Sequence, residues 1–370
     1  MSKTTVIVSV TNDLVTDQRV HKVCTYLQNK SCSVTLVGRR KTDSLPIQRS
    51  YRCKRFRLLF NKGALFYAEF NMRLFFYLLF KKADLFLSND LDTLLANKTA
   101  LRFKSTTTLV YDTHEFFTEV PELVSRPKVQ RIWERIEARI FPKLEHIYTV
   151  NQSIADLYKA KYGKELFVVR NISPLNFCDE EVSRDDLNLP TDKKIVILQG
   201  AGINVDRGAE ELLQAMDHLD GYHLIVVGSG DVIPILKELA KERQDITFVG
   251  KKPYAEMMRY TAHADVGVSL DKDTNINYRY SLPNKIFDYI HAGTPVVASN
   301  LVEVKNIVEK YAVGAIVSSH DPAEIAEKIR YVVEDIAMDK MKSKLKIAAE
   351  ELNWENESLV LDKIYLPLLA

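Results

Sequence analysis

Short runs of β-branched and other apolar residues recur along the chain, and each is followed by a polar loop and a stretch with helical periodicity. In the first half these runs predict strands at residues 5–10, 33–37, 84–88, 107–111, 146–150 and 166–169. In the second half they predict strands at residues 195–199, 223–227, 246–249, 265–270, 295–298 and 315–317. Because apolar strands that alternate with helices form βαβ units, the pattern predicts an α/β protein with two doubly wound parallel sheets.

The stretches between the strands predict amphipathic helices. The clearest are expected at residues 19–30, 127–142, 208–219, 231–243, 253–263, 284–292, 302–311 and 322–335. Residues 178–192 are acidic and have few large apolar side chains, which is typical of a linker. We therefore expect a first domain at 1–178, a linker at 179–192, a second domain at 193–352 and a last helix at 353–370 that packs back toward the first domain. A ligand is expected in a cleft at the carboxyl ends of the strands.

The composition excludes several other classes of protein. With 370 residues, 46% hydrophobic and 27% charged, the chain is too long for one ordinary core and is not disordered. Its four cysteines form no CxxC pair, which argues against a disulfide scaffold and a cysteine zinc site and favours a reducing, cytoplasmic compartment. The apolar run near the N-terminus is too short for a signal peptide, and no apolar run is long enough to span a membrane. Neither a signal peptide nor a membrane-spanning helix is therefore expected.

The net charge of +2 hides an asymmetry between the two halves. Residues 1–178 carry a balance of +13, and residues 179–370 carry a balance of −11. One half is therefore expected to face an anionic partner.

Residues 51–82 stand apart from the rest of the first half. They hold eight lysines and arginines, one acidic residue (Glu69) and ten aromatic residues. A basic, aromatic-rich amphipathic segment is typical of a protein that lies on an anionic membrane surface. Packing of these aromatics on the first sheet is the alternative, and a nucleic-acid partner is not expected because no binding motif accompanies the segment.

The segment from Ser281 to Pro295 carries the most informative chemistry. It opens a helix whose free N–H groups attract phosphate. Lys285 lies in the first turn, where helix polarity disfavours a cation, and this indicates an anionic partner. Asp288 lies one turn further on the same face as Asn284 and could accept hydrogen bonds from a ribose diol. An exposed Lys285–Asp288 pair is the alternative interpretation.

Two glycine-containing loops follow strands in the second half. The first, QGAGINVDRG, holds Gly200, Gly202 and Arg207, and lets the backbone and a forked donor approach a diphosphate. It matches neither a dinucleotide fingerprint nor a P-loop. The second, with Gly228 and Gly230, is a weaker signal because most such loops are only tight turns.

In the first half, polar residues follow two strands. His114 at the end of YDTHE could be a base or an acceptor-binding group, or could only cap its loop. The loop after the first strand carries Asp13, Asp17 and Arg19 without a glycine, which argues against a dehydrogenase.

In these motifs the chain resembles the glycosyltransferases of family 4, whose GT-B fold has two facing Rossmann-like domains. The segments that carry the resemblance lie in family order along nearly the whole chain: NDLVTDQRVHKV, LVYDTHEFFTEVPEL, HIYTVNQSIADLYKAKYG with VVRN, QGAGINVDRG and SLPNKIFDYIHAGTPVVAS. The resemblance implies an enzyme of bacterial polysaccharide or glycan synthesis that transfers a sugar with retention of configuration. The donor would be a UDP- or GDP-sugar held by the second domain, and the acceptor a glycan or lipid-linked molecule held by the first.

The resemblance also assigns roles to residues. It implies that Arg207, Lys285 and His114 take part in catalysis. It places the donor on Gly200, Gly202, Gly228, Gly230, Val249, Gly250, Asn284 and Asp288, and the acceptor on Asp13, Arg19, Asp112 and Glu115. Two cations would then face the diphosphate, and because no DxD motif follows a strand in the family manner, no metal cofactor is expected.

The chain departs from the family pattern at two positions, and its first loop lacks the usual paired glycines. Tyr280 stands where the first glutamate of a paired-glutamate signature is usual, and Ala201 stands where an arginine is usual. The donor sugar and base are therefore left open. A nucleotide-sugar epimerase on the same fold and a non-catalytic nucleotide-sugar-binding protein are the alternative functions.

Overall fold

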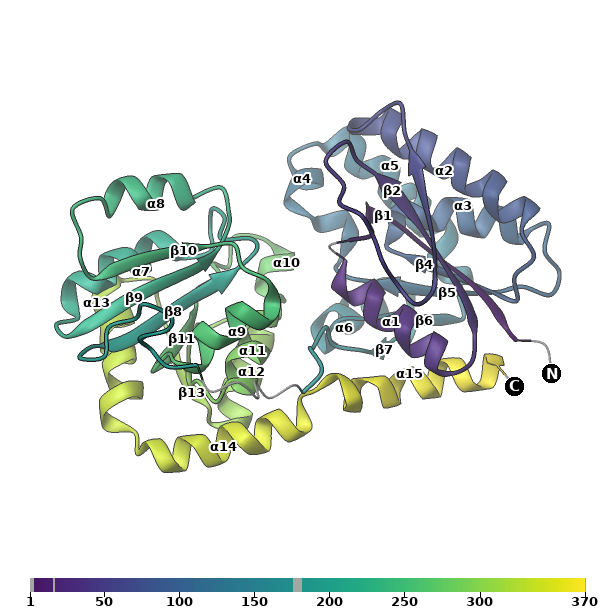
Figure 1. Cartoon of the computed structure of the whole chain (residues 1–370). Helices are drawn as coiled ribbons and strands as arrows, with labels where there is room; N and C mark the ends of the chain where they lie inside the picture. Colours follow the sequence, from purple (N-terminus) through teal and green to yellow (C-terminus); the bar gives the residue numbers. More distant parts are fainter. Residues whose placement is uncertain (1–2, 16, 176–181, 370) are drawn as a thin grey trace. The chain divides into compact units, whose positions relative to one another are not determined.

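The computed structural model describes residues 3–15, 17–175 and 182–369. The chain forms two compact units, the first made of Met1–Asn171 with Ser358–Ala370 and the second of Ile172–Glu357. Each unit is an α/β domain around one parallel sheet, so the predicted fold class is confirmed (Figure 1).

The sheet of the first unit has seven parallel strands in the order β3-β2-β1-β4-β5-β6-β7. Their bounds are β1 Thr5–Asp13, β2 Ser33–Arg40, β3 Arg52–Arg57, β4 Leu85–Asn89, β5 Thr108–Thr113, β6 His146–Thr149 and β7 Phe167–Val168. The helices are α1 Gln18–Asn29, α2 Gly63–Phe80, α3 Leu91–Leu101, α4 Pro121–Val124, α5 Pro127–Ile140, α6 Gln152–Tyr162 and the end of α15 Trp354–Leu369, with short 3₁₀ turns at Phe117–Glu119 and Phe141–Lys143. The strand order reverses beside β1, so the polar residues that follow β1, β4 and β5 share one edge of the sheet.

Strand β3 was not predicted. Residues 51–82 were expected to form one amphipathic segment, whereas the structure divides them into β3 and α2. In β3 the charged Arg52, Lys54 and Arg57 are exposed, and they alternate with more buried residues at the edge of the sheet. Charges on an edge strand oppose pairing with another chain, which accounts for part of the basic composition of this segment.

The end of the chain packs on the first unit. The Tyr26 hydroxyl of α1 donates a 2.7 Å hydrogen bond to Asp362, and Lys30 forms an ion pair with the same carboxylate. Further along α15, the Tyr365 ring lies edge-on to Tyr148 of β6.

The second unit has six parallel strands in the order β10-β9-β8-β11-β12-β13. Their bounds are β8 Lys194–Gly200, β9 Tyr222–Gly228, β10 Ile246–Gly250, β11 Val266–Ser269, β12 Val296–Ser299 and β13 Gly314–Val317. The helices are α7 Ala209–Ala215, α8 Ile233–Leu239, α9 Tyr254–Ala262, α10 Ile276–Arg279, α11 Asn284–His291, α12 Val302–Tyr311, α13 Pro322–Arg330, α14 Met338–Glu351 and the start of α15, with short turns at Met216–His218 and Tyr331–Asp335. Residues of α7, α8 and α13 form the core on one face of this sheet, and residues of α11, α12 and α14 form it on the other.

The segment expected to be a linker lies partly outside the described residues, because 176–181, with Cys178, are not described. Its remainder packs on the second unit. Leu189 is buried in the core beside α11, and Arg184 forms an ion pair with Asp265.

Candidate functional site

The residues predicted to bind a donor gather at the carboxyl edge of the second sheet, where β8 and β9 end in glycine. Here the loops after the two strands bond to each other, because the Ser229 N–H donates to the Gly200 carbonyl and the Ile203 N–H to the Ser229 carbonyl. A Cβ atom on Gly228 would lie 1.8 Å from the Gly200 oxygen, and one on Gly230 would lie 1.9 Å from the Ile203 oxygen. Gly228 and Gly230 are therefore explained by close packing of the two loops, which agrees with the interpretation of this loop as a tight turn.

Arg207 lies just before α7 and is held by two groups. Its guanidinium donates a 2.8 Å hydrogen bond to the buried Asp271 carboxylate and stacks 4.2 Å from the centre of the Tyr278 ring. Burial lowers the pKa of Arg207, but Asp271 outweighs this effect and raises it. The Arg207 side chain is 26% exposed, and its Nε is buried without a hydrogen-bond partner among the described residues.

Lys285 lies in the first turn of α11 and is half-buried. Burial and the charge of Arg207 lower the pKa of its amino group, and Asp271 partly opposes this. No ion pair of Lys285 is found among the described residues. The alternative interpretation, an exposed Lys285–Asp288 pair, is thus not supported, and two cations lie near one carboxylate at this edge.

Asp288 is only 6% exposed and is held in place by neighbouring side chains. Gln199 at the end of β8 donates to one carboxylate oxygen at 3.2 Å, and Tyr254 at the start of α9 donates to the other at 2.8 Å. The Gln199 amide is fixed in turn by the Thr261 hydroxyl. These contacts fix the orientation of the Asp288 carboxylate at the carboxyl edge of the sheet.

The remaining predicted donor residues lie at the same edge. Asn284 is the exposed first residue of α11, a helix whose start has no side-chain cap, so its first N–H groups stay available. Val249 and Gly250 end the neighbouring strand β10.

In the first unit, Arg19 and Asp112 form a buried ion pair. The guanidinium donates to both carboxylate oxygens, at 2.9 and 2.7 Å, and its third donor reaches the Val169 carbonyl. The side chains are 4% and 0% exposed. Their polar atoms face each other, so direct contact with an acceptor is not supported for either residue, and we assign both to the scaffold of this edge.

His114 lies between two carboxylates at the end of β5. Its Nδ1 is 3.1 Å from Asp90, and its Nε2 is 3.2 Å from Asp112. Burial lowers the pKa of the imidazole, but the two carboxylates outweigh burial and raise the pKa to about 9. A ring that stays protonated at neutral pH is a poor base, which argues against one of the two roles predicted for His114.

The other acidic residues at this edge differ in their contacts. Asp13 accepts hydrogen bonds from the Val15 N–H in its own loop and from the Ser44 hydroxyl in the loop after β2. Glu115 is half-buried, and burial together with the charge of Asp90 raises its pKa to about 8. Asp92 accepts from the Thr11 hydroxyl at 2.5 Å, and burial with the Asp90 charge raises its pKa to about 7.

Helix α2 exposes a stripe of apolar side chains. Its members, here called the α2 apolar face, are between 50% and 79% exposed: Leu65, Met72, Phe76 and Phe80. The spacing of seven, four and four residues places them on one side of the helix, opposite the buried Phe70 and Leu74. Exposed apolar stripes of this kind mark an interaction surface.

The single acidic residue of the segment does not face solvent. Glu69 is 7% exposed and accepts hydrogen bonds from the N–H groups of Leu59 and Phe60, and from Arg73. It thereby fixes a loop whose own apolar side chains, Leu59 and Phe60, are also exposed.

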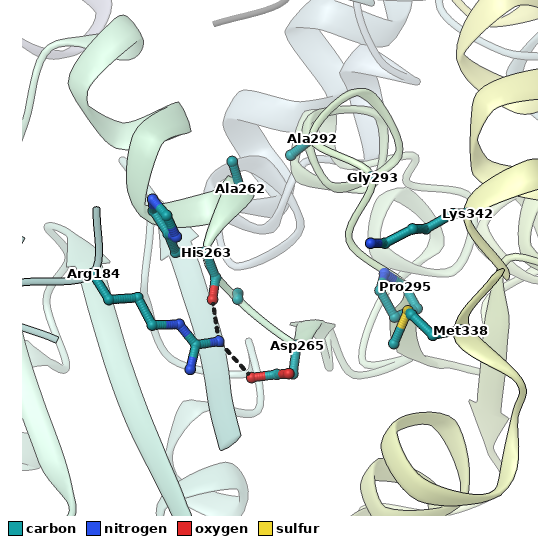
Figure 2. A pocket seen from close by; sticks show the side chains of 10 residues that line it. Arg184, Ala262, His263, Asp265, Ala292, Gly293, Pro295, Met338 and Lys342 are labelled. Atoms are coloured by element: carbon teal, nitrogen blue, oxygen red, sulfur yellow. Dashed lines mark hydrogen bonds and ion pairs between the residues drawn. The ribbon is translucent and has the colours of Figure 1, made fainter. Parts of the chain in front are cut away.

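A separate cavity of about 480 Å³ lies at the opposite, amino edge of the second sheet. Figure 2 shows the Arg184 guanidinium pointing to the His263 carbonyl and the Asp265 carboxylate, with Lys342 on the other side. The main polar groups here bind one another, so this cavity is structural and not the predicted donor site.

Two residues that hold this chemistry were not predicted. Asp271 anchors Arg207 and Asp90 contacts His114, and both follow the end of a buried strand, β11 or β4. The sequence does carry a signal for them, since polar residues just beyond buried parallel strands line the functional edge of a sheet.

The two α/β units, each built around one parallel sheet, match the GT-B fold of solved glycosyltransferase structures. Sucrose-phosphate synthase from Thermosynechococcus elongatus is similar at a TM-score of 0.80 and 18% identity, with 99% of each chain covered. HepE of Anabaena, solved with UDP and glucose, is similar at a TM-score of 0.74 and 15% identity, with 97% of this chain and 98% of the HepE chain covered. WaaG, a glycosyltransferase involved in lipopolysaccharide biosynthesis, is similar at a TM-score of 0.69 and 12% identity, with 97% of this chain and 99% of the WaaG chain covered.

The family models give the same result from sequence. Residues 17–172 match Glycosyltransferase Family 4, and residues 193–335 match Glycosyl transferases group 1. Both models describe glycosyltransferases, and together they match most of both units. The chain therefore belongs to the family 4 and group 1 glycosyltransferases. A comparison with curated proteins found no match.

Proposed function

We propose that the protein transfers a sugar from a nucleoside diphosphate sugar to a glycan or lipid-linked acceptor, with retention of configuration. The observation that carries the proposal is the pair of cations, Arg207 and Lys285, beside the glycine loop after β8. Their only shared carboxylate among the described residues is Asp271. A diphosphate supplies the further negative charge that two clustered cations favour.

In this proposal the protein stabilises the leaving group. Arg207 and Lys285 neutralise the charge that grows on the diphosphate, and the N–H groups at the start of α11 add hydrogen bonds. These charges take the part of a metal ion, so the proposed reaction uses none. Asp288 accepts hydrogen bonds from the ribose, and the base lies against Val249 and Gly250. UDP is the first choice of nucleotide, because the similar HepE was solved with UDP-glucose.

The acceptor is proposed to reach the first unit from a membrane surface. This rests on the α2 apolar face, which exposes four large apolar side chains beside Lys62, Arg73 and Lys81. None of the helices in the described part of the chain is long and apolar enough to cross a bilayer. The α2 helix therefore fits lying on a surface of anionic lipid, with the enzyme working at the cytoplasmic side.

The donor site is tested by turnover. With UDP- and GDP-sugars as donors, Arg207→Ala and Lys285→Ala are each expected to slow nucleoside diphosphate release roughly 100-fold or more, because each removes a preorganised charge. Arg243→Ala is the matched control, since Arg243 pairs with Asp217 and Asp245 at the opposite edge. Near-normal turnover of both variants at saturating donor would refute the site.

A further inference from the structure

Asp90 stands between β4 and α3 in a strained backbone conformation, with φ of 57° and ψ of 167°. A positive φ is unfavourable for a non-glycine residue and persists only where the surrounding structure holds it. An aspartate in this place normally caps its helix, yet the Asp90 side chain makes no capping bond to α3.

Both Asp90 carboxylate oxygens are turned to His114 instead. Oδ1 accepts a 2.8 Å hydrogen bond from the His114 backbone N–H, and Oδ2 lies 3.1 Å from Nδ1 of its ring. The Asp90 N–H donates at 2.8 Å to the Asp112 carbonyl, which ties the ends of β4 and β5 together. One residue thus fixes both the backbone and the ring of His114.

The second carboxylate completes the arrangement. Asp112 lies 3.2 Å from Nε2 of the ring and is itself held by Arg19. Nε2 is buried and makes no hydrogen bond among the described residues, so its contact with Asp112 is one of charge. A neutral imidazole between two carboxylates would turn a lone pair toward one of them, whereas an imidazolium presents positive charge to both.

The surrounding charges favour the same state. Besides Asp90 and Asp112, the charged group that acts on His114 is Arg19 from α1, which opposes protonation. Asp92 and Glu115 also lie close, but their own raised pKa values, about 7 and about 8, leave them only partly ionised at neutral pH. The pKa of about 9 is the balance of burial, which lowers it, and the carboxylates, which raise it.

We propose that Asp90 is a positioning residue that holds the His114 imidazole as a fixed, protonated cation at the carboxyl edge of the first sheet. His114 then takes part in the transfer as a positive charge and not as a proton acceptor; this reading of its role rests on the proposed function. Asp90 acts through His114 and need not touch a substrate.

The test is an NMR titration of the His114 ring in the full chain, without donor or acceptor. Its resonance is assigned by its absence from His114→Gln. The wild-type midpoint is expected near pH 9, and Asp90→Asn should lower it by at least about one pH unit, since one neighbouring charge is lost. Asp84→Asn is the matched control and should leave the midpoint unchanged, because Asp84 binds the Thr5 N–H at the other end of β4.

Two results would overturn the proposal. The first is an unchanged midpoint in Asp90→Asn, which would give Asp90 only a structural role. The second is a wild-type midpoint at or below 6.5, the ordinary value for histidine, and this result does not depend on whether any variant folds. Failure of the proposed transferase activity is a separate outcome, because the titration uses neither substrate.

Discussion

At the scale of single residues, Asp288 shows how neighbouring side chains orient a carboxylate. Gln199 and Tyr254 fix its carboxylate from two sides, so it is oriented before any ligand arrives. Preorganisation of this kind favours binding, because fewer side chains must be ordered when the complex forms.

The proposed ribose contact gives a prediction for Asp288. Asp288→Asn is expected to weaken UDP binding by about 1–3 kcal/mol, the scale of a hydrogen bond to a charged group. Calorimetry with UDP and with 2′,3′-dideoxy-UDP measures the effect. The dideoxy nucleotide should bind wild type and variant alike, whereas an equal loss for both ligands would indicate a general structural role.

At the scale of elements, α2 shows how one helix can serve two environments. Phe66, Phe70, Leu74 and Leu78 are buried, while the α2 apolar face stays exposed. A helix that is apolar on every side is normally buried on every side. The exposed α2 apolar face therefore indicates that this helix has a binding partner.

A lipid surface as that partner is tested by flotation with phosphatidylglycerol vesicles. Wild type should float at low salt, and Leu65→Ser/Phe76→Ser/Phe80→Ser should remain largely in solution, because the inserted apolar area is lost. The matched control changes three other exposed apolar residues, Ile235, Leu239 and Ile347, to serine and should float like wild type.

Charge should contribute to the same binding. Lys62→Gln/Lys81→Gln/Lys82→Gln is expected to weaken binding by up to about 1 kcal/mol per residue at low salt, and less at high salt. Wild type that stays in solution with every lipid composition and salt concentration would favour a soluble acceptor instead.

At the scale of the whole molecule, the strongest pKa increases among acidic groups and histidines gather in the first unit. The pKa of Asp92 is raised to about 7, that of Glu115 to about 8 and that of His114 to about 9. Each group binds its proton more tightly when folded than when unfolded, so each contributes stability at low pH that is lost as pH rises through its folded pKa.

The first unit is therefore expected to lose stability as pH rises from about 4, where Asp92 and Glu115 begin to ionise in the unfolded chain, to about 9, the folded pKa of His114. Urea unfolding at several pH values, followed by hydrogen exchange to locate the loss, measures this. Rising stability over that range, or a loss confined to residues 172–357, would contradict the prediction.

The sequence by itself determined the two parallel sheets, because apolar strands and helical periodicity can be recognised within a short window. It also predicted the helix that begins just after Arg207 and the helix that carries Lys285 and Asp288, since both helices follow from local order along the chain. The edge strand β3 was missed for two reasons. Its alternation of charged and more buried residues is short, and it lies within a segment whose basic, aromatic-rich composition was interpreted as a whole.

Only the tertiary structure decided which side chains meet. The pairs Arg19–Asp112, Arg207–Asp271 and Asp90–His114 join residues 93, 64 and 24 positions apart. Such pairs depend on the order in which strands are placed in the sheet, which no local pattern specifies. The exposed side of α2 was decided in the same way, because a helix that is apolar on both sides gives no local signal of which side will pack on its neighbours.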